Sequence, residues 1–356
     1  MSYFSDRFPK ISIYFSRIRE NVFLKRLTPL FAMVAALIVG AIFILAVNAN
    51  PLDAYKEMIM ATIGSRNGLT ETLVKATPLA LIALGTTIAY RCKMWSIGQE
   101  GQMTMGAIFS AGVALALGNQ PSWYLIPLLM AAGILGGALW GIIPALMKTK
   151  FNVDEIISSL MLNSIALLFG SYLVNHPWRQ RPGFIPQTPQ IPINARLPIL
   201  IEQSRLHIGI LIVIVVAIVI HFILWKTTLG YQIRAVGNNP KASTYGGINV
   251  VKSILIAMIL SGGLAGLAGM IEVTGIQYRL KDGISMGYGY TAIVIALMGK
   301  LNPIAVTGVA ILFGALIIGA DAMQFAENVP VFLASIIQGA VVLFILLGEP
   351  QFLRKK

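Results

Sequence analysis

The residues of this sequence that could do chemistry are polar side chains at the start of an apolar run. Met94–Gln102 reads MWSIGQEGQ, so the carboxylate of Glu100 stands between the amides of Gln99 and Gln102. A charge in such a place is costly unless it lies near an interface, is paired or faces water. The two glycines of the stretch favour bent or unwound backbone, which is tolerated only inside protein or beside a cavity. We therefore expect these three polar side chains to lie inside the protein or to line a path through it.

A second polar pair lies further along the chain. Ser159 and Asn163 are four residues apart in an apolar run, so they share one helix face. They could line the same path, or they could form a hydrogen bond between two helices. An alternative also exists for Glu100, which would simply be interfacial if the helix of its stretch began near Met103. The sequence alone leaves these alternatives open.

The sequence shows no motif for catalysis or metal binding. It has no G-x-x-x-x-G-K-[ST] phosphate loop, no H-E-x-x-H and no G-x-S-x-G. His176, His207 and His221 lack the spacing of metal ligands, and the lone Cys92 excludes an internal disulfide framework. We expect no catalytic residue, no metal and no cofactor, so any ATP hydrolysis must come from another chain.

Long apolar runs must position these polar residues. Of the 356 residues, 56% are hydrophobic and 12% are charged, against about 25% charged in a soluble domain. Runs of this length, without the alternation of barrel strands, predict an all-α polytopic membrane protein. We predict ten spans, at Thr28–Val47, Glu71–Tyr90, Trp95–Leu117, Trp123–Met147, Glu155–Val174, His207–Trp225, Ser253–Val273, Tyr288–Met298, Pro303–Ala322 and Val329–Leu347.

Positive charge predicts the orientation of the spans. Most of the 27 Lys and Arg residues fall in the two tails and in alternate loops, which the positive-inside rule places in the cytoplasm. The net charge of +13 therefore requires no nucleic-acid partner. We predict cytoplasmic tails at 1–27 and 349–356 around a transmembrane domain at 28–348. Within that domain, the outer loop 175–206 is rich in proline and should be extended and semi-rigid.

Glycines at four-residue spacing occur in two of the spans. Gly133, Gly137 and Gly141 lie in one span, and Gly262 and Gly266 lie in another. Small residues at this spacing let helices approach closely in lipid. We interpret them as packing residues.

The loop 226–252 is basic without an acidic residue, so it should lie in the cytoplasm. Within it, Asn239 is a good N-cap and Pro240 fits the first helical position. Gly246 or Gly247 can end the helix. This pattern predicts a short capped helix across the cytoplasmic face, a shape that another protein can grip. The alternative is a solvated connector that contains a turn.

Three stretches resemble one family, the permease subunits of bacterial ABC importers for nucleosides and simple sugars, which are related to branched-chain amino acid permeases. AVGNNPKASTYGGINV at 235–250 resembles the signature A-x-G-x-N-P-x-A-A-x-x-x-G-I, with Ser243 for the second alanine. MWSIGQEGQ resembles F/W-N-I-G-x-E-G-Q, and Ser96 in place of asparagine puts in doubt any hydrogen bond that the family makes there. NVDEIISSLMLN at 152–163 resembles N-E-V-I-x-T-I-M-L-N.

This resemblance implies that the short helix docks into a cleft of an ATPase subunit and passes its motion to the membrane domain. The implied ATPase-coupling residues are Gly237, Asn238, Asn239, Pro240, Lys241, Ala242, Tyr245, Gly246 and Gly247. The implied partners are a cytoplasmic ABC ATPase, a second homologous permease in a heterodimer, and an extracytoplasmic solute-binding lipoprotein. The implied place is the bacterial cytoplasmic membrane, with lipid around a multi-pass chain.

The chain length and the basic N-terminal tail resemble the larger permease of the nucleoside importers. The implied solute is a purine nucleoside first, then ribose or another simple sugar, and then branched-chain amino acids. Near the outer end of its span, Glu272 would meet the binding protein or an outer-loop arginine. The candidates for the translocation path are Gln99, Glu100, Gln102, Ser159, Asn163 and Glu272.

Two rival functions belong to other classes. An ion-coupled secondary transporter usually needs several ionisable groups inside the membrane, and few polar side chains occur in these spans. Such a transporter also has no use for a gripped cytoplasmic helix. A membrane enzyme needs a nucleophile or a metal constellation, and the sequence shows neither.

Overall fold

The computed structural model describes residues 34–35, 37–183, 185–327, 332, 336, 339–340 and 343–344. The predicted span Val329–Leu347 and both predicted tails lie largely or wholly outside these residues. The first part of Thr28–Val47 lies outside them too.

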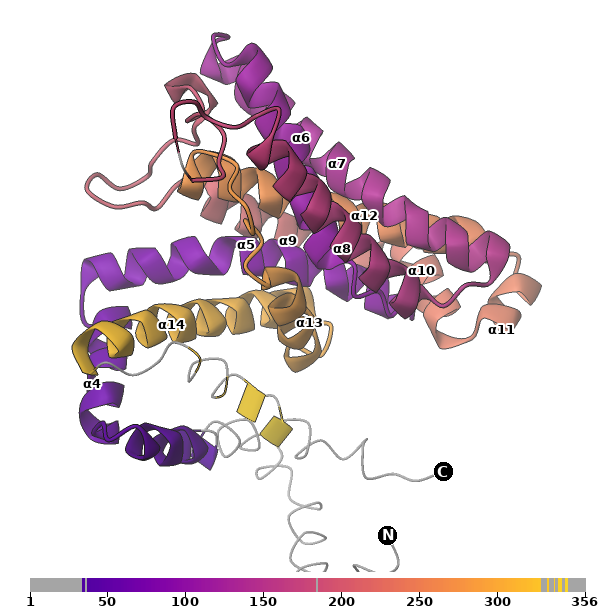
Figure 1. Ribbon diagram of the computed structural model, residues 1–356. Helices are drawn as coiled ribbons and strands as arrows, with labels where there is room; N and C mark the ends of the chain where they lie inside the picture. Colours follow the sequence, from indigo (N-terminus) through magenta and orange to yellow (C-terminus); the bar gives the residue numbers. More distant parts are fainter. Residues whose placement is uncertain are drawn as a thin grey trace, which may run out of the picture. The chain divides into compact units, whose positions relative to one another are not determined.

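The regular elements of the described residues are helices (Figure 1). Besides an apolar helix at Leu37–Ala46, they include α4 (Pro51–Thr62), α5 (Arg66–Arg91), α6 (Gln99–Leu117), α7 (Ser122–Phe151), α8 (Glu155–Asn175), the 3-10 helix η1 (Ile193–Ala195), α9 (Gly209–Lys226), α10 (Thr228–Asn238), α11 (Pro240–Tyr245), α12 (Val250–Ile271), the π-helix η2 (Glu272–Gln277), α13 (Tyr288–Met298) and α14 (Pro303–Glu327). The predicted all-helical fold is confirmed over this part of the chain.

Six helices of the described residues are long and apolar enough to cross a membrane. They are α5, α7, α8, α9, the continuous run Val250–Gln277 and α14. The count of ten spans and the cytoplasmic side of both termini stay predictions.

The chain forms two compact units, one of residues 1–61 with 319–356 and one of residues 62–318. In the first unit, the hydroxyl of Tyr55 on α4 donates a hydrogen bond to the carbonyl of Leu37. The second unit holds every predicted site residue.

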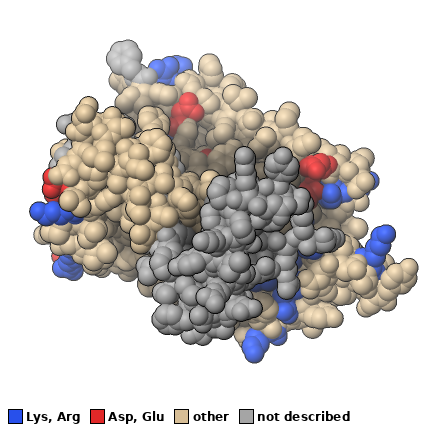
Figure 2. All heavy atoms as spheres, turned by 90° about the horizontal axis from the view of Figure 1, so that it is seen from below, with Lys and Arg blue, Asp and Glu red and all other residues tan. Residues whose placement is uncertain are grey.

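Within the second unit, α5 and α12 form the centre. Helix α12 packs against α5, α6 and α7. In the apolar segment of α5, 89% of the residues are buried, against 28% in that of α9. Outer helices such as α8 and α9 leave large apolar side chains exposed, among them Leu168, Ile218 and Phe222. On the face drawn in Figure 2, the described surface is mostly uncharged, with charged side chains in small separate groups. These helices therefore offer lipid an apolar exterior.

Glycines bring α7 and α12 into backbone contact. A Cβ added to Gly137 would lie 2.1 Å from the carbonyl oxygen of Gly262, and one added to Gly266 would lie 2.1 Å from that of Gly133. No larger residue fits at these crossings without moving a helix. The predicted close approach is confirmed.

The loop 226–252 contains one helix more than the sequence predicted. Besides the short helix at 240–245 it holds α10, which starts at the N-cap Thr227. Helix α10 is amphipathic and buries Ile233 and Val236 in an apolar cluster. The prediction missed it because the polar residues of 226–252 were interpreted together as a loop.

The outer loop 175–206 has little regular structure in its described residues. It contains η1 and takes part in two isolated bridges, Gln187 with Lys281 and Ile199 with His207. The predicted lack of helix over most of this segment is confirmed, whereas its extended conformation and its outer side stay predictions.

Candidate functional site

The stretch before α6 is unwound, partly buried and held by hydrogen bonds. The Ser96 side chain is fully buried, and its hydroxyl accepts from the amide of Gly98 at 3.2 Å. Helix α6 starts at Gln99, and Glu100 is only 3% exposed. The alternative of a start near Met103 with an interfacial Glu100 is therefore wrong.

The carboxylate of Glu100 caps the N-terminus of α13. Its Oε1 accepts from the amide of Gly287 at 2.8 Å, and its Oε2 accepts from the amide of Gly289 at 2.7 Å. A carboxylate is favoured there because the first amides of a helix have no partner within the helix and carry a partial positive charge. A Cβ on Gly289 would lie 2.4 Å from the backbone nitrogen of Glu100, so glycine is needed for the approach.

Helix α8 holds the unwound stretch from the other side. The Oδ1 of Asn163 accepts from the amide of Gly101 at 2.8 Å, and its Nδ2 donates to the carbonyl of Ile97 at 2.8 Å. The hydroxyl of Ser159 accepts from the amide of Ile97 at 3.0 Å. The hydrogen bonds between segments that the sequence left as an alternative are thus present. They satisfy backbone groups that a helix would otherwise satisfy itself.

The side-chain amides of Gln99 and Gln102 differ from the side chains of Ser159 and Asn163 because they have no hydrogen-bond partner among the described residues. The two side chains are 0% and 1% exposed, and among the described residues neither the nitrogen nor the oxygen of either amide has a hydrogen-bond partner. A buried polar group left without a partner costs about 1–3 kcal/mol. These four atoms are therefore suited to bind something that enters the site.

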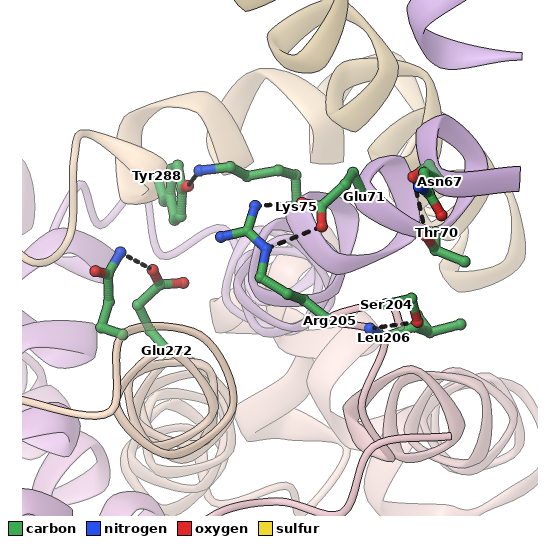
Figure 3. A network of polar contacts seen from close by, with 10 residues as sticks. Asn67, Thr70, Glu71, Lys75, Ser204, Arg205, Leu206, Glu272 and Tyr288 are labelled. Carbon is green, nitrogen blue, oxygen red and sulfur yellow. Dashed lines mark hydrogen bonds and ion pairs between the residues drawn. The ribbon is translucent and has the colours of Figure 1, made fainter. Parts of the chain in front are cut away.

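A second polar group gathers around the N-terminal part of α5 (Figure 3). Arg205 forms an ion pair with Glu71, with Nε 2.9 Å from Oε1. The hydrogen bond to Glu71 raises the pKa of the Arg205 guanidinium above its ordinary value. One turn further along α5, the ammonium of Lys75 donates to the phenol oxygen of Tyr288 at 3.2 Å. A lysine in an apolar span was the signal by which the sequence could have revealed this group.

Glu272 lies at the start of the π-helix η2 and is fully buried. Its Oε1 accepts from Nε2 of Gln277 at 3.0 Å, and Lys281 donates to Oε1 of Gln277 at 2.8 Å. In the part of the chain that the structure describes, its expected ion pair with an outer-loop arginine is absent, because Arg205 pairs with Glu71.

Helix α11 has the caps that the sequence predicted. The Oδ1 of Asn239 accepts from the amide of Ala242 at 3.1 Å, Pro240 is the first residue, and Gly247 turns the chain with φ +79°. Tyr245 is 93% exposed. In Figure 1, α11 lies beyond α10 at one end of its unit. Ser243, the departure from the family pattern, is buried and bonds back to the carbonyl of Asn239.

Arg91 joins α10 to the turn between α13 and α14. Two guanidinium groups lie over the ring of Trp225, near the end of α9. The guanidinium carbon of Arg91 is 5.1 Å from the ring centre, and that of Arg234, on α10, is 4.6 Å from it. Two nitrogens of Arg91 also donate to the carbonyl of Leu301, at 3.0 and 2.9 Å. A Cβ on Gly237 would lie 2.0 Å from the carbonyl oxygen of Arg91. The end of α5 thus contacts both segments.

The sequence that forms this site matches one protein family over most of its length. The family described as "Branched-chain amino acid transport system / permease component" matches residues 68–346. The chain belongs to this family. The permease is 35% identical over 332 residues to the glucose ABC transporter permease protein TsgB13 of Haloferax volcanii, covering 90% of this chain and 87% of that one.

Two further relatives come from Bacillus subtilis. The guanosine ABC transporter permease protein NupP is 33% identical over 323 residues, covering 90% of the permease and 92% of NupP. The guanosine ABC transporter permease protein NupQ is 32% identical over 249 residues, covering 68% and 78%. A solved structure, PsaBC from Streptococcus pneumoniae in complex with Fab, matches with a TM-score of 0.50 and 13% identity, over 83% of the permease and 95% of that chain. The likeness to PsaBC shows a shared fold alone.

The permease is therefore a multi-pass protein of the cell membrane and an ABC transporter permease of the nucleoside and sugar type. It is not itself an enzyme, because ATP hydrolysis lies on a partner subunit. An ABC permease works with an ATPase and a substrate-binding partner. The rival class of ion-coupled transporters is not favoured.

Proposed function

We propose that this permease imports purine nucleosides and that α11 is its contact with the ATPase. The observation that carries the proposal is a capped, exposed helix that packs against α10 and the start of the apolar helix α12. Similarity to NupP supports the nucleoside. A simple sugar is the second candidate, supported by the similarity to TsgB13.

The proposed ATPase contact consists of the nine residues named for coupling. All of them are exposed except Gly237, which is buried against the carbonyl of Arg91. This proposal places the segment 226–252 and both termini in the cytoplasm, following the distribution of Lys and Arg. The translocation path would run along the N-terminal part of α6. Its proposed walls are Gln99, Glu100, Gln102, Ser159, Asn163 and Glu272.

The proposed partners are a second homologous permease and an extracytoplasmic binding lipoprotein. Two guanosine permeases of one organism, NupP and NupQ, both resemble this chain, which supports pairing of two different permeases. Co-purification with the product of a neighbouring homologous gene tests the pairing. Isolation of a homodimer that transports without that product contradicts it.

The test of the function is uptake of labelled guanosine, adenosine, ribose and glucose in cells with and without this gene. We expect nucleoside uptake to require the gene and to stop on ATP depletion while the ion gradient is kept. If cells without the gene lose only sugar uptake, the transported solute is a sugar instead of a nucleoside. Uptake that survives ATP depletion but fails with an ionophore contradicts the ATP-driven mechanism.

The test of the coupling helix is the double variant Asn239→Ala, Pro240→Ala. It removes the N-cap and the first residue of α11, and we expect guanosine uptake to fall at least tenfold with normal membrane insertion. Asn249→Ala is the matched control, since Asn249 caps α12 in the same way by accepting from the amide of Lys252. Each cap contributes about 1 kcal/mol. Equal uptake by the two variants would sink the docking hypothesis.

A further inference from the structure

The polar residues of the proposed path divide into two groups by what their polar atoms contact. Glu100, Ser159 and Asn163 make hydrogen bonds to backbone groups of neighbouring segments. Glu272 is intermediate, because its Oε1 accepts from Gln277 while its Oε2 has no partner among the described residues. Gln99 and Gln102 are as deeply buried, yet their amides have no partner within the described part of the chain. Only the first group has a structural role that explains its polarity.

The two amides lie on neighbouring positions of one helix face, since the residues are three apart on α6. The nitrogen Nε2 of Gln102 is 3.3 Å from the point where a Cβ on Gly141 would lie, and that point is 2.8 Å from the carbonyl oxygen of Met258. The amide of Gln102 therefore lies where α6 meets α7 and α12. Glycine at 141 leaves the amide room that a side chain would fill.

The carboxylate of Glu100, which lies between the two glutamines in the sequence, is already bound to another helix. The carboxylate of Glu100 is bound at the N-terminus of α13. A buried helix N-terminus is otherwise a ready site for an anion. Because the protein's own carboxylate fills it, this helix end is closed to an anionic solute. The α6 side chains left for a ligand are neutral amides, each with donors and an acceptor side by side.

We propose that Gln99 and Gln102 bind the transported solute directly and select a neutral molecule that carries adjacent hydrogen-bond donors and acceptors. The edge of a purine base and the hydroxyls of a sugar share this chemistry, whereas a phosphorylated solute does not. This inference rests on the proposed transport function. Of the six residues proposed to line the path, it assigns two to direct contact with the solute. Since both amides are closed to solvent in this structure, the solute reaches them only when α6 separates from its neighbours.

The first experiment replaces each amide with an apolar side chain of similar length. We expect Gln99→Met and Gln102→Met to raise the KM for labelled guanosine about tenfold each, which corresponds to about 1.4 kcal/mol. The thermal midpoint of the purified permease should not fall, because methionine removes polar atoms that have no partner. Gln120→Met, at an exposed position just beyond α6, is the matched control. A wild-type KM in both buried variants overturns the proposal.

A second measurement tests the proposal if the methionine variants insert poorly into the membrane. Burial raises the pKa of the Cys92 thiol to about 12, so the native cysteine reacts little with water-soluble thiol reagents. Gln102→Cys, in the assembled transporter during turnover, should react with a charged methanethiosulfonate, and bound solute should slow the reaction about tenfold. Ser110→Cys is the control, because Ser110 is buried on the same helix and bonds within it. Its modification should be slow with or without solute.

The choice of protecting solute separates the two proposals. Protection by glucose and not guanosine overturns the nucleoside function and leaves the contact residues standing. Protection by neither solute, in cells that still take up guanosine, overturns the contact residues and leaves the function standing. Protection by guanosine 5′-monophosphate as strong as that by guanosine overturns the selection of neutral solutes.

Discussion

Two helix contacts in this permease are equally close and are built in opposite ways. Where α7 crosses α12, glycines let backbone touch backbone, with a Cβ on Gly137 only 2.1 Å from a carbonyl oxygen. Where α6 meets α13, the carboxylate of Glu100 accepts two backbone hydrogen bonds. The first contact depends on shape and the second on polar partners.

This difference indicates which contact can open during transport. Close-packed surfaces lose about a quarter to a half of their dispersion attraction when a gap of about 0.5–1 Å opens between them. A carboxylate and helix amides can instead exchange their partners for water or solute as helices separate. Since a Cβ on Gly269 would lie 2.1 Å from the carbonyl oxygen of Met103, the backbones of α6 and α12 touch in the same way. We infer that α7, α12 and the adjoining part of α6 move together, whereas the proposed path can widen where α6 meets α13.

The largest expected effect comes from filling the glycine crossing. Gly137→Val forces two backbones apart, and we expect a loss of more than about 3 kcal/mol and little folded protein. Gly308→Ala on α14 is the control, because no atom lies within 4 Å of the added Cβ. There, removal of a helical glycine should stabilise by about 0.5–1 kcal/mol. Detergent size-exclusion profiles against temperature measure both, and a stable Gly137→Val contradicts the shape argument.

A smaller effect is expected at the polar contact. Glu100→Ala leaves the amides of Gly287 and Gly289 without their acceptor, and we expect a loss of about 3 kcal/mol. Glu100→Gln keeps one acceptor oxygen, so it should lose about half as much. The thermal midpoints of the two variants test this order. Equal midpoints for alanine and glutamine would show that the carboxylate does not hold α13.

The smallest effect is expected at the solvent-exposed pair. The Arg205 side chain is 57% exposed in its ion pair with Glu71. Such pairs contribute about 0–1 kcal/mol and weaken with salt. Arg205→Gln should shift the thermal midpoint by a few degrees at most, and by less in 0.5 M NaCl. A shift as large as that of Glu100→Ala would mean that exposure does not distinguish the two polar contacts.

Local patterns in the sequence were sufficient to predict several elements of the fold. Tyr288–Met298 was predicted with the bounds that α13 has, and the caps of α11 follow from Asn239, Pro240 and Gly247. These features depend on a few neighbouring residues, so their signals lie close together in the chain.

Features that join distant residues could not be predicted. Nothing near Glu100 indicates that its partners are Gly287 and Gly289, which lie 187 and 189 residues further on. The same applies to Arg205, whose partner Glu71 is 134 residues away. Periodicity and composition identify the helices, but the partners of a buried charge depend on how the helices pack.

The contacts of Arg91 have a mechanical consequence. One face of its guanidinium lies against Trp225, beside α10, and its nitrogens bind the carbonyl of Leu301 after α13. A push on α11, passed through α10 and Arg91, would therefore reach the C-terminal end of α13 and compress this helix as a short rod. The opposite end of that rod is anchored by Glu100. If α11 binds the ATPase as proposed, the force that it transmits would load the hydrogen bonds of Glu100, and breaking these hydrogen bonds would set the force at which the proposed path opens.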